Sequence, residues 1–88
     1  MNFSIRIKGS ATRELERIAK ADRARLVEAI DRLSESPFLG SALKGEMRDL
    51  RRLRVGDYRV LYEVQRDALI VLVVRVAHRR DAYRRRTR

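Results

Sequence analysis

Alternating hydrophobic and polar positions predict strands at the start of the chain and over its second half. Between Phe3 and Ile7 every second residue is apolar, which is typical of a short strand with one buried face. Similar patterns predict three further strands, at about 49–55, 58–65 and 69–77. Gly56-Asp57 fits a two-residue hairpin turn between the first two of these, and Arg66-Asp67 predicts a second tight turn.

Between these strands, apolar residues repeat at helical spacing. Ser10 is the predicted N-cap of a first helix and Asp22 that of a second. Ser36-Pro37 ends the second helix, because the residue before a proline avoids helical geometry. Residues 38–46 have no clear periodicity and predict a loop. The expected fold is α+β: an N-terminal strand and an α-helical hairpin packed on an antiparallel sheet of about four strands, with a short C-terminal helix or tail.

Strand alternation predicts which side chains share a face. If Gly56-Asp57 is a two-residue turn, Val55 pairs with Tyr58 and Arg54 with Arg59, and successive side chains point to opposite faces. The face expected to pack on the helices carries Leu53, Val55, Tyr58, Val60, Tyr62 and Val64. Arg52, Arg54 and Arg59 share the other face. Arg75 and Arg79 have one parity on the last strand, together with Leu69, Val71 and Val73. If this set faces outward with the other arginines, the open face has an apolar floor under a cluster of guanidinium groups.

The charge of the chain favours a polyanionic partner. Its 22 basic and 12 acidic residues give a net charge of +10, and all but three of the basic residues are arginines. Residues 1–46 carry nine bases and seven acids, whereas residues 47–88 carry thirteen bases and five acids. Arginine binds phosphate through two parallel hydrogen bonds and stays charged when partly desolvated. We therefore expect nucleic acid or an acidic protein as the partner; the alternative is a basic surface with no dedicated partner.

Other features exclude several classes of protein. A chain of 88 residues is long enough for one domain, which we expect to span 1–88. There is no cysteine and the one histidine is His78, so we predict neither a metal site nor a cofactor. The longest apolar run, residues 68–74, is too short to cross a membrane. The sequence predicts a cytoplasmic protein.

Arginines gathered on one sheet face repel one another, and a phosphate backbone would relieve that repulsion. The alternative is that Arg52 and Arg54 are held in surface ion pairs, which contribute only about 0–1 kcal/mol each. The acidic candidates for such pairs are Glu46, Asp49 and Glu63.

Two segments resemble a known family. Leu43-Lys44-Gly45 and the stretch from Leu50 to Tyr62, L-R-R-L-R-V-G-D-Y-R-V-L-Y, are similar to the sheet core of the RelE/ParE toxin superfamily. The segment from Val76 to Tyr83, V-A-H-R-R-D-A-Y, resembles the C-terminal motif of the RelE branch. The resemblance covers essentially the whole chain and implies the RelE-like microbial RNase fold. It also implies a type II toxin that enters the ribosomal A site and cleaves the messenger RNA there, with the ribose 2′-hydroxyl as nucleophile.

The same resemblance assigns catalytic roles. Arg59 corresponds to the arginine that stabilises the phosphate, Arg79 to the one near the leaving group, and Tyr83 to a tyrosine that stacks on or orients a base; Tyr83 could instead be a core residue. Arg52 stands where relatives carry a basic residue, usually lysine, that serves proton transfer or charge stabilisation. Because arginine stays protonated near neutral pH, Arg52 is a poor general base. Either it acts electrostatically or another group takes the proton.

His78 is the first alternative for the proton transfer, since imidazole exchanges protons near neutrality. Strict alternation, however, places it on the face opposite Arg79. Glu63 shares parity with Arg59 and is a second candidate, unless it orients an arginine. The other basic residues that we expect to bind RNA are Arg51, Arg54, Arg75 and Arg80.

Two other functions stay open at this point. A ParE-like toxin would share the fold and an antitoxin but would inhibit DNA gyrase by binding it, with no need for Arg59, Arg79 and Tyr83. A catalytically inactive RNA-binding relative would hold RNA by charge alone, with an affinity that falls steeply with salt. The partners implied by the ribonuclease interpretation are messenger RNA, the ribosomal A site and a cognate antitoxin with an acidic toxin-binding segment. Toxin and antitoxin would form a hetero-oligomer.

Overall fold

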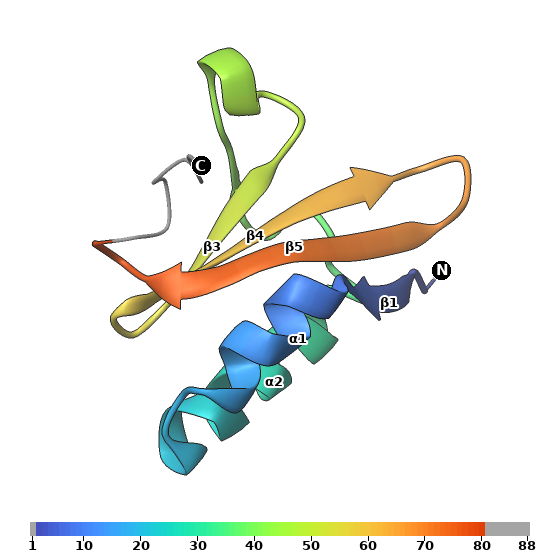
Figure 1. Cartoon of the computed structure of the whole chain (residues 1–88). Coiled ribbons are helices and arrows are strands. Elements are labelled where there is room, and N and C mark those ends of the chain that lie inside the picture. Colours follow the sequence, from blue (N-terminus) through green and yellow to red (C-terminus); the bar gives the residue numbers. More distant parts are fainter. Residues whose placement is uncertain (1, 81–88) are drawn as a thin grey trace.

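The computed structural model describes residues 2–80 and has two helices packed against one face of a five-stranded sheet (Figure 1). The chain begins with β1 (Ser4–Ile7), α1 (Gly9–Glu16) and α2 (Lys20–Arg32). It continues with β2 (Ser41–Ala42), the 3-10 helix η1 (Gly45–Met47), β3 (Arg51–Val55), β4 (Tyr58–Gln65) and β5 (Ile70–His78). This arrangement confirms the α+β fold class. No helix within residues 2–80 is long and apolar enough to cross a membrane.

The sheet is mixed and has one strand more than expected. Its strand order is β1-β5-β4-β3-β2, and β1 pairs in parallel with β5 while the other pairs are antiparallel. The alternation in residues 3–7 predicts a buried face but carries no information about the neighbouring strand. The extra strand, β2, is only two residues long and lies in the segment predicted to be a loop, where no apolar alternation marks it.

Both helices begin one or two residues before the predicted caps. Lys8 and Ala19 occupy the N-cap positions of α1 and α2, and neither makes a side-chain capping hydrogen bond. The predicted caps Ser10 and Asp22 are therefore wrong. Asp22 lies in the first turn of α2, where its negative charge interacts favourably with the helix dipole.

The β3–β4 hairpin has the predicted register and buried face. Val55 pairs with Tyr58 across a two-residue turn, and Gly56 supplies the positive φ (60°) that such turns require. Val60 and Tyr62 are fully buried in a core with Leu26 and Ile30 of α2. The helices consequently cover the apolar face of the hairpin and leave Arg52, Arg54 and Arg59 on the opposite face.

The prediction for β5 was wrong in part. Val71 and Val73 are fully buried on the helix side, not on the outer face. Val73 pairs with Tyr62 and Arg75 with Leu61, so that Val74 is an extra residue in a β-bulge. The bulge reverses the alternation, and Arg75 still reaches the outer face. The turn before β5 is also longer than expected, since Gln65 pairs with Ile70 and the turn ends at Leu69 with a φ of 55°.

The loop after α2 is held to the sheet by the buried hydroxyl of Tyr62. This hydroxyl donates a hydrogen bond to the Pro37 carbonyl (2.8 Å) and accepts one from the Gly40 N–H (2.9 Å). Arg51 adds a bond from its Nε to the Gly40 carbonyl (3.0 Å). These contacts fix the path of residues 37–40 beside β3.

Tyr62→Phe should lower the free energy of unfolding by about 1–3 kcal/mol, because it leaves a buried N–H and a buried carbonyl without their partner. Urea denaturation measures this change. Tyr58→Phe is the matched control, because the Tyr58 hydroxyl makes no hydrogen bond within residues 2–80. Its expected change is below about 0.5 kcal/mol. Equal losses in the two variants would contradict the anchoring role of Tyr62.

Candidate functional site

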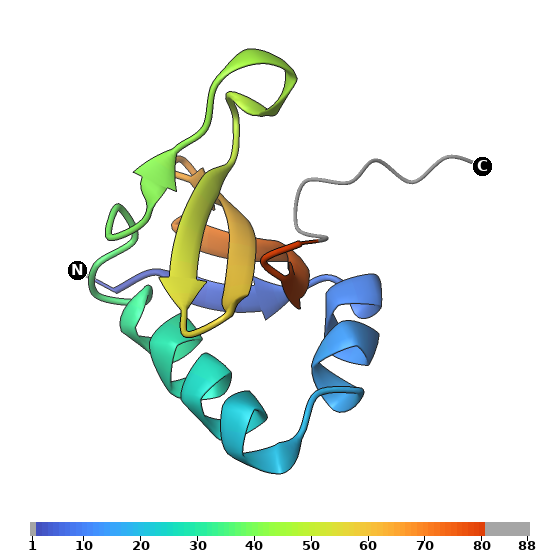
Figure 2. The same ribbon diagram turned by 90° about the vertical axis from the view of Figure 1, so that its left-hand side faces the viewer.

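By their register, four of the predicted RNA-contacting arginines lie on the sheet face opposite the helices. Figure 2 shows how the strands lie relative to the two helices. In one row across the sheet, Arg52 lies opposite Leu61 and Leu61 opposite Arg75. In the next row, Arg54 lies opposite Arg59. Directly opposite residues share a face. We call this set, which comprises Arg52, Arg54, Arg59 and Arg75, the arginine face. Leu61 is 2% exposed and forms its apolar floor in place of the valines predicted for that role.

Arg59 is the arginine whose surroundings point most directly to an anion. Its side chain is half-buried, and its Nε is shielded from solvent without a hydrogen-bond acceptor among residues 2–80. Its guanidinium makes one long bond, 3.4 Å from Nη1 to the Tyr58 carbonyl. A buried donor without an acceptor costs about 1–3 kcal/mol. Because Nε is shielded, a phosphate oxygen over the sheet would supply the missing acceptor only if the guanidinium turned toward it.

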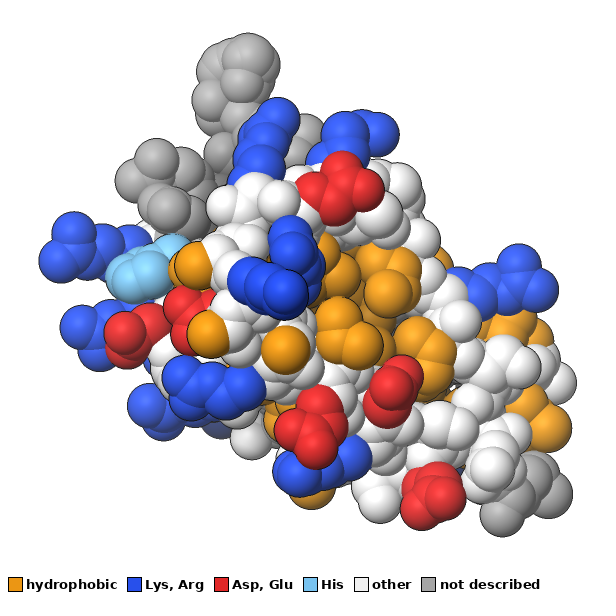
Figure 3. All heavy atoms as spheres, turned by 90° about the horizontal axis from the view of Figure 1, so that it is seen from below, with side chains coloured by type: hydrophobic (Ala, Val, Ile, Leu, Met, Phe, Trp, Pro, Cys, Tyr) orange, Lys and Arg blue, Asp and Glu red, His pale blue; other side chains and the backbone are white. Residues whose placement is uncertain are grey.

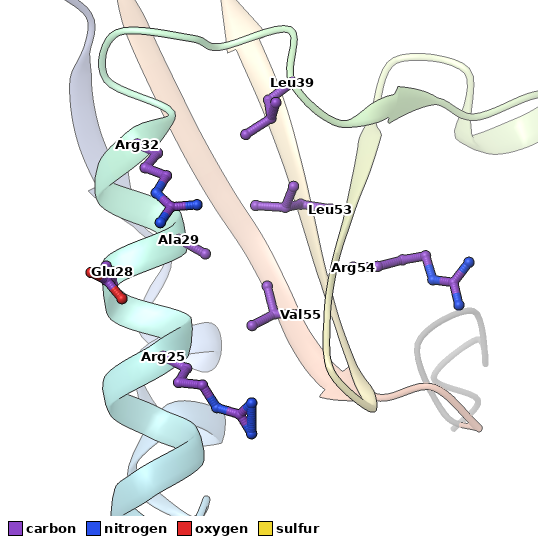
Figure 4. Close-up of a pocket in the computed structure, with 8 residues that line it drawn as sticks. All are labelled: Arg25, Glu28, Ala29, Arg32, Leu39, Leu53, Arg54 and Val55. Atoms are coloured by element: carbon purple, nitrogen blue, oxygen red, sulfur yellow. The ribbon is translucent and has the colours of Figure 1, made fainter.

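Arg54 is exposed and makes no hydrogen bond or ion pair with the part of the chain that the structure describes. Figure 4 shows Leu53 and Val55 pointing toward α2 while Arg54 points away from it. The alternation predicted for β3 is therefore visible in the side chains. Within residues 2–80 the alternative ion pair of Arg54 with Glu46, Asp49 or Glu63 does not form.

A pocket of about 240 Å³ lies on the other side of the hairpin, between α2 and β3 (Figure 4). Its lining residues are Arg25, Glu28, Ala29, Arg32, Leu39, Leu53, Arg54 and Val55. Of the residues predicted to act on RNA it includes Arg54 alone. The pocket and the arginine face therefore share Arg54 and no other residue.

Arg79 and Arg80 lie where the described chain ends. The Arg79 N–H donates a hydrogen bond to the Asp57 carbonyl (2.7 Å), which places Arg79 beside the β3–β4 turn, two residues beyond the Ala77 that pairs with Arg59. The Arg80 N–H donates to Nδ1 of His78 (3.3 Å). Both arginines are exposed. Tyr83 falls outside the described residues, as does most of the predicted C-terminal helix or tail.

The structure does not bring His78 or Arg51 to the arginine face. His78 pairs with Tyr58, and the two rings pack edge to face on the helix side of the sheet, with centroids 5.8 Å apart. Arg51 also has helix-side parity, and its guanidinium lies over the ring of Phe38 at 5.2 Å. Its bonds go to the Phe38 and Gly40 carbonyls. We therefore place neither residue in the candidate site.

Two carboxylates lie near the arginine face. Glu63, one of the candidate bases, accepts a hydrogen bond from Gln65 (3.0 Å). Glu14 of α1 was not predicted: one of its oxygens accepts a bond from the Val76 N–H (2.8 Å) and the other lies 3.8 Å from Nε of Arg75. No pattern in the sequence marks a contact between residues so far apart. Within residues 2–80 no group of three potential ligands could hold a metal ion.

The helix side of the molecule differs in charge from the arginine face. Figure 3 shows acidic side chains interspersed with basic ones around hydrophobic side chains on the side seen from below, where the helices lie. A surface of mixed sign attracts a polyanion weakly. The arginine face is thus the better candidate for a nucleic-acid interface.

Comparison with known proteins identifies related chains. The family model described as ParE toxin of type II toxin-antitoxin system, parDE, matches residues 5–83. Toxin RelG of Mycobacterium tuberculosis is 34% identical, over 97% of this chain and all of its own length. Toxin RelE of the same organism is 30% identical, over 93% of this chain and 87% of its own length. The toxin–antitoxin complex RelBE2 from M. tuberculosis contains a chain with a TM-score of 0.84 and 29% identity, aligned over 89% of this chain and 99% of that one.

Proposed function

We propose that this chain, which belongs to the RelE/ParE superfamily of type II toxins and to its RelE-like branch, cleaves messenger RNA in the ribosomal A site. The observation that carries the proposal is the arginine face, and above all the shielded Nε of Arg59 that has no acceptor among residues 2–80. A site built to bind a protein such as gyrase has no need for four arginines on one face of a sheet.

The proposed reaction is an internal transesterification. The ribose 2′-oxygen attacks the adjacent phosphorus, the bond from phosphorus to the 5′-oxygen breaks, and the products are a 2′,3′-cyclic phosphate and a 5′-hydroxyl. The proton lost by the 2′-oxygen is balanced by the one gained at the 5′-oxygen. Negative charge grows on the phosphoryl oxygens during the attack. Fixed cations aimed at those oxygens stabilise the transition state more than the ground state.

The positions of the arginines support a division of labour. Arg59, at the centre of the sheet and half-buried, binds a non-bridging oxygen of the scissile phosphate. Arg52 adds charge from the neighbouring strand, and Arg54 and Arg75 bind the flanking phosphates. Arg79, beside the β3–β4 turn, stabilises the leaving 5′-oxygen. Base stacking by Tyr83 stays a prediction.

The proposed site is rich in cations and poor in bases. The arginines remain protonated, and His78 packs on Tyr58 at the opposite face. We therefore propose that the protein depends on the ribosome to bend the message so that the 2′-oxygen lies in line with the leaving group. Naked RNA would be cleaved slowly, because the enzyme alone supplies charge stabilisation but not this alignment.

We also propose a cognate antitoxin as the partner that holds the toxin inactive. The solved relative RelBE2 is a toxin–antitoxin complex. The net charge of +10 favours an antitoxin whose toxin-binding segment is acidic. Toxin and antitoxin would form a hetero-oligomer.

Mapping RNA ends after a brief induction of the toxin tests the proposal. The expected result is cuts within the codon in the A site of translating ribosomes, with 5′-hydroxyl ends on the downstream fragments. The same message without ribosomes should stay intact over the same time. Intact messages in cells with blocked gyrase would contradict the proposal, as would equal cleavage of free and ribosome-bound RNA.

A further inference from the structure

We infer that Glu14 of α1 is a positioning residue for the arginine face: its carboxylate holds Arg75 and the adjoining β5 backbone in the arrangement that RNA cleavage requires. The inference rests on the proposed function. It assigns a role in the site to the helix layer, which contributes none of the predicted RNA contacts.

Glu14 accepts a backbone hydrogen bond from the part of β5 that has no neighbouring strand on the β1 side. The parallel pairing with β1 ends at Val73, whose carbonyl accepts a hydrogen bond from the Lys8 N–H (2.9 Å). Beyond this point α1 packs against β5 (Figure 1). The Val76 N–H donates to Oε1 of Glu14 (2.8 Å). A partly buried backbone donor must find an acceptor, so this bond fixes the strand immediately after its bulge.

The second carboxylate oxygen acts on the neighbouring side chain. Oε2 of Glu14 lies 3.8 Å from Nε of Arg75, and the two side chains are 21% and 23% exposed. The ion pair is thus partly withdrawn from water, where screening is weaker than at the surface. At 3.8 Å this contact is an ion pair and not a hydrogen bond. Because one oxygen is already fixed on the backbone of Val76, the other places its negative charge beside the Arg75 guanidinium and attracts it.

This arrangement controls the geometry of the proposed site in two ways. Arg75, Leu61 and Arg52 lie in one row across the sheet, with Arg75 at the β5 end. The Glu14 carboxylate offsets part of the repulsion between the two arginines. Val76 directly precedes Ala77, the partner of Arg59, so its hydrogen bond also fixes the strand that leads to Arg79. A shift of about 1 Å in such groups can cost on the order of 100-fold in rate.

A double-mutant cycle separates positioning from general stability. In Glu14→Gln the amide oxygen still accepts the bond from Val76, but the ion pair with Arg75 is lost. We expect Glu14→Gln to slow single-turnover cleavage of ribosome-bound message about 10-fold in the native protein. In an Arg75→Ala background the same change should cost less than about twofold, because the partner it orients is absent. Glu16→Gln, an exposed change on the same helix, should have no effect.

The outcomes are distinguishable. Equal losses in the two backgrounds would mean that Glu14 acts independently of Arg75 and would overturn the inference. So would a Glu14→Gln protein with native activity, or one that fails to fold although its hydrogen bond to Val76 is kept; thermal melts monitored by circular dichroism decide the last point. If the native protein leaves ribosome-bound message intact, the proposed function fails and the inference fails with it. Native cleavage with additive mutants would overturn the inference alone.

Discussion

Arg59→Ala is expected to slow cleavage of ribosome-bound messenger RNA by on the order of 100- to 1,000-fold, the range seen when one preorganised donor to a transition-state oxyanion is removed. Growth arrest on induction should disappear. The fold should persist, because the outer-face guanidinium makes only one long hydrogen bond within residues 2–80, to the carbonyl of its own neighbour Tyr58. The substitution also removes a shielded Nε donor that has no acceptor among residues 2–80, which favours the stability of the fold.

Two variants make the result of Arg59→Ala specific. Arg13→Ala removes the same charge from an exposed position on α1 and should leave the cleavage rate unchanged. Arg59→Lys keeps the charge but loses the planar pair of donors and should give an intermediate rate. Full activity in Arg59→Ala, or equal losses in Arg59→Ala and Arg13→Ala, would mean that general charge and not this site accounts for the activity.

Gly40→Ala should lower the free energy of unfolding by about 3 kcal/mol, at the upper end of the usual cost of overpacking. An added Cβ would lie 2.4 Å from the Arg52 carbonyl oxygen and 2.9 Å from the Tyr62 hydroxyl. Neither obstacle is the free end of a flexible side chain. The midpoint of thermal unfolding should fall by more than about 10 °C for a chain of this size, as measured by differential scanning calorimetry.

Gly9→Ala is the matched control for this glycine. A Cβ at position 9 would meet only the distal Nη1 of Arg13, at 3.8 Å. Because alanine restricts the unfolded chain more than glycine does, the variant should be as stable as the native protein or more stable by about 0.5 kcal/mol. Similar destabilisation by the two substitutions would show that the close approach of residue 40 to β3 is not what limits that position.

The β3–β4 hairpin could be predicted from the sequence because local rules determine it. Gly56-Asp57 fixes a two-residue turn, the turn fixes the register, and the register fixes which face each side chain takes. The pairing of Arg54 with Arg59 and the burial of Val60 and Tyr62 follow directly. The shared face of Arg54 and Arg59 is therefore predictable from the sequence alone.

β5 and β1 could not be predicted in the same way. Residues 70–74 of β5 are all apolar, so no period-two pattern reveals the extra residue at Val74 that turns Val71 and Val73 inward. The choice of β5 as the partner of β1 depends on a long crossover through both helices, and on packing that becomes favourable only when the whole sheet forms.

The positions of individual site residues also depend on strand alternation and on packing between distant segments. Arg51 and Arg52 are adjacent in sequence, yet alternation sends one to the loop carbonyls at 38 and 40 and the other to the outer face. His78, the last residue of β5, still pairs with Tyr58 and therefore lies on the same face of the sheet as Tyr58. Glu14 is marked by no motif, because its role arises from the packing of α1 beside the free edge of β5.

The side-chain Nε–Hε resonance of Arg59 tests the central claim most directly. A short single-stranded RNA with 2′-O-methyl groups cannot be cleaved and presents its phosphates to the protein throughout a titration followed by nuclear magnetic resonance. We expect the Arg59 Nε–Hε signal to shift strongly as the guanidinium turns from its shielded position to a phosphate oxygen, and the signal of Arg13 to move little. An unchanged Arg59 signal, with the shifts confined to arginines of the helices, would contradict the assignment of the arginine face as the RNA site.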